Sequence, residues 1–225
     1  MTNEEIYSIN HSYEVAVRNL NSRAWEVMLP SEKIQDLQAI ENKNAMDQNR
    51  IACEVRSEPM QQGTWGYHLN SQIVINSNEL DNPEYLEHVD TVFHEGSHAR
   101  DEQAQFIREV QSQYTPEQLA ERSTPIPDPE TDPQGYWSHP AEVAAREAGE
   151  KGVDQILTDR EHIVEVDCQM RGENPVNQII QTYDYNALEM PAEPMQNEAS
   201  MDAAQSVGMD VSAGMDGGID GGMDA

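Results

Sequence analysis

Apolar residues in the first part of the chain recur at helical spacing. Residues 1–50 are predicted to be helical with a break at Leu29-Pro30-Ser31, since proline is tolerated only in the first turn of a helix. Beyond the break, the apolar positions that set the helical period are Ile34, Leu37, Ile40 and Met46. The chain is therefore expected to begin with consecutive helices rather than with a sheet.

The spacing then changes from helical to alternating. Residues 51–56 alternate apolar and polar side chains, which predicts a strand. Residues 65–69 and 73–75 are predicted to pair as a hairpin with Asn70-Ser71 at the bend, and a turn is expected near Gln62-Gly63. A small sheet should therefore follow the first helices.

A new helix start follows at Asn82-Pro83-Glu84, where asparagine suits the N-cap, proline the first helical position and glutamate the first turn. This helix is expected to extend to about Ser112. Its buried face is predicted to contain Leu86, Val89, Phe93 and Gly96.

Prolines divide the segment that comes next. Residues 115–135 are rich in proline and polar residues, so we expect a long loop. Pro140 should open a helix over 141–149, followed by a second helical stretch over 153–168 and a short helix within 174–185. Strands grouped between helices predict an α+β fold.

The long central helix carries the motif His94-Glu95-Gly96-Ser97-His98. Histidines four residues apart lie on one face of a helix, so both imidazoles can reach one metal ion. Glu95 projects beside them, where it can take a proton from a water that the metal activates. The pattern predicts a Zn²⁺ site with His94 and His98 as ligands and Glu95 as a catalytic base.

Catalytic zinc usually has three protein ligands and one open position, so a third ligand must come from another segment. Glu142 is the preferred candidate, because two imidazoles and one carboxylate form a common catalytic set, and Arg146 one turn later could pair with that carboxylate. His139 is the competing ligand. Asp101 and Glu102 are not favoured, since they are too close in sequence to His98.

The order of strand, H-E-x-x-H helix, long loop and Pro140-x-Glu142-x-x-Ala145-Arg146 resembles the zincin-like metallopeptidase domains of bacterial polymorphic toxins and related effectors. The similarity covers roughly residues 29–149. It implies a zincin fold, in which a small sheet packs on the active-site helix and an edge strand pairs with the substrate. It also implies Glu142 as third ligand.

The reaction expected of such a site also needs a hydrogen-bond donor for the oxyanion of the tetrahedral intermediate. Tyr136 and His139 are both candidates, because they lie just before the helix that carries Glu142. The strand 72–76 is predicted to be the shelf that binds an extended peptide by strand addition.

Composition narrows the class of partner. The formal charge is −29, with 42 acidic and 13 basic residues, so nucleic acid and anionic membranes are not expected to bind. A protein or peptide substrate, with a basic one favoured by charge, fits better. Cys53 and Cys168 form no motif and are predicted to be free thiols.

The sequence contains no apolar stretch typical of a secretory leader or of a membrane span. We therefore expect a cytoplasmic protein, or one that is exported by a route without a classical signal peptide.

Two regions differ sharply in composition. Residues 1–186 are predicted to form the zincin-like domain, with a core at about 29–149. Residues 187–225 contain acids but no lysine or arginine, and they end in a degenerate Gly-Met-Asp repeat. This acidic tail is predicted to be disordered, because it has too few large apolar residues to offset the entropy of ordering.

The best hypothesis from these patterns is a zinc metallopeptidase, in the context of a toxin or effector. Two alternatives belong to other classes: a non-catalytic acidic interaction module with a structural metal, and an acidic mimic that occupies a basic nucleic-acid-binding partner. The glutamate at position 95 favours the peptidase, since a structural site needs no base there.

Overall fold

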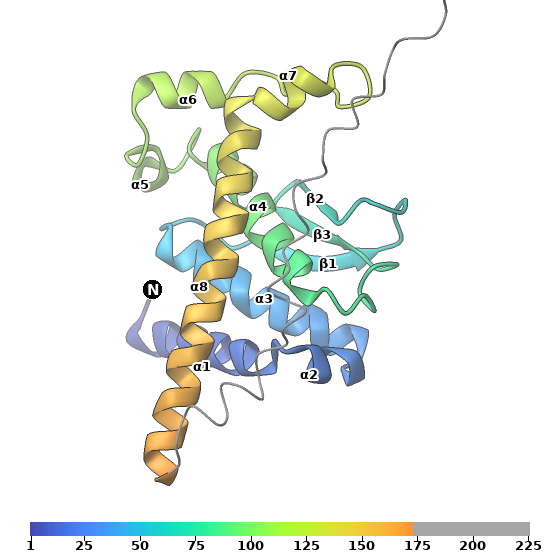
Figure 1. The fold of residues 1–225 in the computed structure, drawn as a ribbon. Coiled ribbons are helices and arrows are strands. Elements are labelled where there is room, and N and C mark those ends of the chain that lie inside the picture. The colour runs from blue at the N-terminus through green and yellow to red at the C-terminus, as the bar shows by residue number, and fades with distance from the viewer. Residues whose placement is uncertain (173–225) are drawn as a thin grey trace, which may run out of the picture. The chain divides into compact units, whose positions relative to one another are not determined.

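The computed structural model describes residues 1–172, which form eight helices and one small sheet (Figure 1). The helices are α1 (Asn3–Asn19), α2 (Ser22–Val27), α3 (Pro30–Asp47), α4 (Tyr85–Gln103), α5 (Arg108–Gln111), α6 (Pro116–Arg122), α7 (Pro133–Ser138) and α8 (Pro140–Arg171). The strands are β1 (Glu54–Glu58), β2 (Gly66–Leu69) and β3 (Gln72–Asn76). Their sheet lies at one side of α3 and α4. The predicted α+β class is confirmed, with helices as the larger part.

A proline starts α3 and an asparagine cap starts α2. Pro30 occupies the first turn of α3, so the predicted break is confirmed. A further interruption, which the apolar pattern did not indicate, separates α1 from α2. There Asn21 leaves the helical conformation, and its side chain accepts a hydrogen bond from the backbone N–H of Ala24 as an N-cap.

The strands form a sheet in the order β1-β3-β2, with β1 parallel and β2 antiparallel to β3. The predicted hairpin of β2 and β3 is confirmed. Asn70 (φ 51°) and Ser71 (φ 60°) are both left-handed, as a tight hairpin turn of this hand requires. The strand predicted at 51–56 begins later, at Glu54.

The position of β3 corrects one prediction. Because β3 pairs with β1 on one side and with β2 on the other, its backbone has no free edge. The prediction that 72–76 forms the substrate shelf is therefore wrong. Ile73, Val74 and Ile75 are all fully buried, and a continuous apolar run of this kind is typical of a central strand. The edge strand beside α4 is β2.

Helix α4 lies at the centre of the fold, with α8 across one side and α3 and the sheet on the others (Figure 1). It is shorter than predicted. Asn82 accepts a hydrogen bond from the backbone N–H of Glu84 in a turn before the helix, and the chain leaves the helix after Gln103. The Gln103 side-chain amide exchanges two hydrogen bonds with the backbone of Ile51, which ties this end to the entry of β1.

The buried face of α4 is rotated relative to the prediction. Val89 and Gly96 are buried, but Leu86 and Phe93 are only partly so. The remaining buried positions along the helix are Tyr85, His88, Thr91, Val92, Ser97, Ala99, Asp101 and Gln103. The helix is surrounded on more than one side, so its buried surface is wider than one apolar stripe.

Helix α6 lies within the segment that was predicted to be a long loop, and α7 begins at the end of that segment. Thr115 caps α6 in a capping box with Gln118, and Asp132 caps α7 through the N–H of Gly135. In both helices a proline follows the cap directly, so these prolines start helices instead of preventing them.

Helix α8 is one continuous helix, where two were predicted. Gly149 and Gly152 do not break it, because they are the points of closest approach to α4. A Cβ on Gly149 would lie 2.3 Å from Asp90 Oδ1, and one on Gly152 would lie 2.1 Å from the Phe93 ring. The helix ends at Gly172, which has a φ of 68°.

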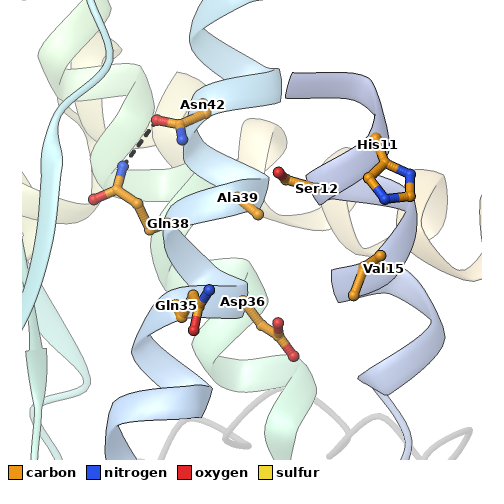
Figure 2. A pocket seen from close by; sticks show the side chains of 8 residues that line it. All are labelled: His11, Ser12, Val15, Gln35, Asp36, Gln38, Ala39 and Asn42. Carbon is orange, nitrogen blue, oxygen red and sulfur yellow. Dashed lines mark hydrogen bonds between the residues drawn. The ribbon is translucent and has the colours of Figure 1, made fainter. Parts of the chain in front are cut away.

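A shallow cavity of about 300 Å³ lies between α1 and α3 (Figure 2). Its polar lining includes His11, Asp36, Gln38 and Asn42, and the Gln38 amide donates to Asn42 Oδ1 over 2.9 Å. The residues that line this cavity come from α1 and α3, and none of them is a lysine or an arginine.

Both cysteines are buried free thiols, as predicted. None of the helices in residues 1–172 is long and apolar enough to cross a bilayer. The helix predicted within 174–185 and the acidic tail at 187–225 lie outside the described residues.

We predict that Gly152→Ala destabilises the protein by about 1–3 kcal/mol, because the added methyl group overlaps the Phe93 ring. Helix propensity alone favours alanine by about 1 kcal/mol, so the two effects have opposite signs. Urea denaturation measures the difference, and Phe93→Leu in the same chain should restore part of the loss. A Gly152→Ala variant more stable than the parent would contradict the packing argument.

We also predict an acid-dependent loss of stability at His88. Burial lowers its pKa to about 4 from an ordinary value of 6.5, and the side chain is fully buried. The unfolded chain therefore binds a proton below pH 6.5 that the folded chain refuses, and stability falls as the pH drops from 6.5 towards 4. Urea denaturation should show a decrease between pH 7 and 4.5 that is roughly 2–3 kcal/mol larger than in His88→Phe. Equal decreases would show that His88 is not responsible.

Candidate metal centre

His94 and His98 present their imidazoles on one face of α4. The ring centroids lie 5.1 Å apart with an angle of 68° between the planes. Both side chains are partly exposed, at 18% and 16%, so the pair borders solvent while its helix is anchored in the core. This is the arrangement that the H-E-x-x-H spacing predicts.

On the side opposite the two histidines, α4 packs against buried polar side chains. A Cβ on Gly96 would lie 2.8 Å from both Arg50 Nη2 and Asn44 Nδ2, so only glycine fits. Arg50 forms a bidentate ion pair with Glu41, with N–O distances of 2.5 and 2.7 Å and both side chains fully buried. This close contact fixes how near α4 lies to the Glu41–Arg50 pair, on the side of the helix opposite the two histidines.

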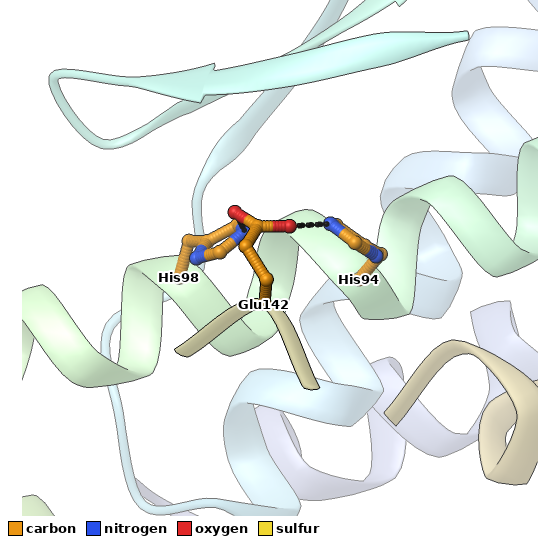
Figure 3. A group of neighbouring side chains, drawn as sticks. All are labelled: His94, His98 and Glu142. Atoms are coloured by element: carbon orange, nitrogen blue, oxygen red, sulfur yellow. Dashed lines mark ion pairs between the residues drawn. The ribbon is translucent and has the colours of Figure 1, made fainter. Parts of the chain in front are cut away.

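Glu142, on the first turn of α8, lies between the two histidines (Figure 3). Its Oε1 is 3.2 Å from His98 Nε2, and its Oε2 is 3.6 Å from His94 Nε2. The carboxylate also sits at the positive end of the helix dipole. Burial by itself would raise the pKa of the Glu142 carboxyl, but the two histidines and Tyr136 outweigh burial and lower the pKa well below its usual range.

The spacing of these three groups fits a metal ion. One ligand atom from each residue lies within 4.8 Å of the others. Ligands about 2.1 Å from a tetrahedral zinc are about 3.4 Å apart, which is close to the two distances from Glu142. Glu142 Oε2 is buried and has no hydrogen-bond donor in the described part of the chain. A buried anionic oxygen without a donor is costly, and a cation would satisfy it.

Glu95 adjoins this group without belonging to it. Burial raises the pKa of its carboxyl, the electrostatic interaction with His94 and His98 opposes that rise, and the interaction with Glu142 adds to it. The backbone N–H of His68, on β2, also interacts with this carboxylate. The motif glutamate therefore lies between the histidine pair and the edge strand.

Tyr136, on α7, lies near the Glu142 carboxylate. Burial raises the pKa of its phenol, and the charge of Glu142 raises it further, so the hydroxyl keeps its proton at neutral pH. Arg146 does not take the role predicted for it. Its guanidinium lies 4.7 Å above the Trp137 ring and donates to the Trp137 carbonyl, because Glu142 is already directed at the histidines.

His139 is held away from the group as the N-cap of α8. Its Nδ1 accepts from the N–H of Ala141 over 3.2 Å, so Nε2 carries the proton and donates to Thr124 Oγ1 over 2.8 Å. Both ring nitrogens are therefore engaged. The structure brings Glu142, and not the competing His139, to the histidine pair.

The two acids that the sequence disfavoured as ligands also have other roles. Asp101 is buried and accepts hydrogen bonds from Tyr114 and Arg122. Glu102 is exposed and lies 3.4 Å from the imidazole of His68.

Asp90 was missed by the sequence reasoning. It precedes His94 by one helical turn, is shielded by α8 at Gly149, and interacts electrostatically with His94. Carboxylates behind metal-binding histidines orient the imidazoles and raise their basicity. The spacing of an acid four residues before the first histidine was the available signal.

Comparisons with models of protein families, with curated proteins and with solved structures find no match for this chain. The geometry of His94, His98 and Glu142 therefore carries the functional argument: this group could hold a metal ion.

We predict that the protein binds one equivalent of zinc, and that Glu142→Ala and His98→Ala each weaken binding at least about 100-fold. Competition with a chromophoric chelator measures the affinity. Glu147→Gln, an exposed acid on the same helix, and His139→Ala should both bind zinc like the parent. Loss of zinc in His139→Ala with retention in Glu142→Ala would overturn the ligand assignment.

Proposed function

We propose that this chain is a zinc-dependent peptidase of the zincin type, with His94, His98 and Glu142 as ligands and Glu95 as general base. One observation carries the proposal: two histidines of one helix and a buried glutamate of another converge at metal-ligand spacing, with a second carboxylate beside them. Its sequence support is the resemblance of the H-E-x-x-H and P-x-E-x-x-A-R segments to zincin-like domains. The same resemblance would place the peptidase among toxin or effector domains.

The proposed chemistry divides between the metal and the chain. When bound, zinc supplies Lewis acidity, which makes water acidic near neutral pH and polarises a carbonyl group. Glu95 accepts the proton of the attacking water and later donates it to the leaving amine. Burial raises the pKa of its carboxyl, which favours holding the accepted proton until the amine leaves.

Tyr136 is the proposed donor to the oxyanion. Its phenol keeps its proton and interacts with the Glu142 carboxylate. His139 does not take part in the proposed reaction, because both of its ring nitrogens hold the α7–α8 junction.

The substrate in this proposal is an extended peptide that adds to the free edge of β2. This strand is at the edge of the sheet, packs beside α4, and brings the backbone of His68 to Glu95. Gly66 lets β2 approach closely, since a Cβ there would lie 2.6 Å from the Val74 carbonyl oxygen and 2.7 Å from the Thr91 side chain. The negative charge of the protein favours peptides with basic residues.

We predict that Glu95→Gln keeps zinc and the fold but lowers the rate of peptide cleavage at least about 100-fold, because the amide cannot accept the proton. Cleavage of a denatured protein in the presence of zinc, followed by gel electrophoresis and mass spectrometry, measures the effect. Glu147→Gln is the matched control and should cleave like the parent.

Equal behaviour of Glu95→Gln and the parent in every cleavage assay, with zinc bound in both, would reject the peptidase. That result would favour the alternative of a non-catalytic interaction module in which the metal stabilises the fold.

A further inference from the structure

A second polar site lies on the neighbouring face of α4. It is a groove of about 400 Å³ between α4, α8, the C-terminal end of α3 and α6. Arg100, Arg122 and Lys151 line it, and Glu147 is the one acid in its lining. The chain has 42 acidic and only 13 basic residues, so a groove lined by three basic residues and one acid departs from the composition of the chain as a whole.

The two arginines are held in place before any ligand arrives. The ring of Tyr114 lies 4.8 Å from the guanidinium carbon of Arg100 and 5.4 Å from that of Arg122. Arg100 Nε donates to the Tyr114 oxygen over 2.9 Å, while the Tyr114 hydroxyl and Arg122 Nη1 both donate to Asp101 Oδ1. Fixed guanidinium groups lose little conformational entropy when an anion binds.

Several donors at this groove remain available. Within residues 1–172, neither Nη atom of Arg100 has a hydrogen-bond partner, and Arg122 uses only Nη1. Ser97 is buried and its hydroxyl makes no hydrogen bond with the described residues. Asn44 is 93% buried, and its Nδ2 has no acceptor among them. Unpaired donors of this kind are costly unless an acceptor reaches them.

We propose that this groove binds a small multivalent oxyanion, such as a phosphate or a dicarboxylate. The free fork of Arg100 matches two oxygens of one anionic group, and Arg122 and Ser97 can donate to the others. Within residues 1–172, Lys151 pairs with Glu147 alone, and a ligand can displace this exposed pair at little cost. The cavity between α1 and α3 in Figure 2 has no such cations and contains Asp36.

The groove is separate from the candidate metal centre. Successive residues of a helix point about 100° apart, so Ser97 and His98 face different directions from α4. A ligand in the groove would contact Phe93, Ser97 and Arg100, and none of these belongs to the metal-binding group.

Isothermal titration calorimetry of the full chain tests the proposal. Inorganic phosphate and succinate are the two probes, each against sodium chloride at matched ionic strength. We expect saturable binding of at least one probe, and which of them binds distinguishes a phosphate from a carboxylate ligand. Arg100→Gln should weaken that binding at least about tenfold, and Ser97→Ala, which leaves the arginines in place, should weaken it about threefold.

Two controls assign the binding to the groove. Arg108→Gln removes one arginine from the exposed surface of α5 and should bind like the parent. Glu142→Gln, which disables the metal-binding group, should also bind like the parent. Absence of saturable binding for both probes, or equal affinities in the parent, Arg100→Gln and Ser97→Ala, would overturn the proposal. Loss of binding in Glu142→Gln would also overturn it, because the probe would then occupy the metal centre.

Discussion

The close packing of α8 against α4 is what brings the three candidate metal ligands together. The two histidines of the motif belong to α4, but the group that completes their set is on α8. Gly149 and Gly152 allow the helices to approach until Asp90 and Phe93 occupy the space that side chains would fill. A shift of one ångström at this interface would take Glu142 out of ligand distance, since metal-ligand bonds tolerate only a few tenths of an ångström.

The other side of α4 is supported by a charged group instead of an apolar one. The buried pair of Glu41 and Arg50 also holds the backbone N–H of Cys53, so it joins α3, the entry of β1 and the middle of α4 at Gly96. Such a pair adds little net stability, because desolvation offsets its attraction, but it tolerates few alternative geometries. Removal of either partner would leave an isolated buried charge against Gly96, on the side of α4 opposite the histidines.

Much of the local structure could be predicted from the sequence, because it depends on neighbouring residues. His94, Glu95 and His98 are on one helix because their spacing matches its period. Asn70-Ser71 forms the hairpin bend, and the proline at position 30 starts a helix. The preference for Glu142 as third ligand came partly from residue type and partly from a family resemblance, and the structure places it at the histidines.

What the sequence could not determine was which surfaces meet. Alternation and apolar runs identified the strands, but only pairing made β3 central and left β2 at the edge. Gly149 and Gly152 looked like the end of a helix until α4 was packed against them, and Arg146 and His139 were near the site in sequence but bond elsewhere. Short-range patterns depend on backbone geometry, which the sequence specifies locally. The direction of a side chain towards a distant partner depends on the packing of whole helices, and only the tertiary structure decides it.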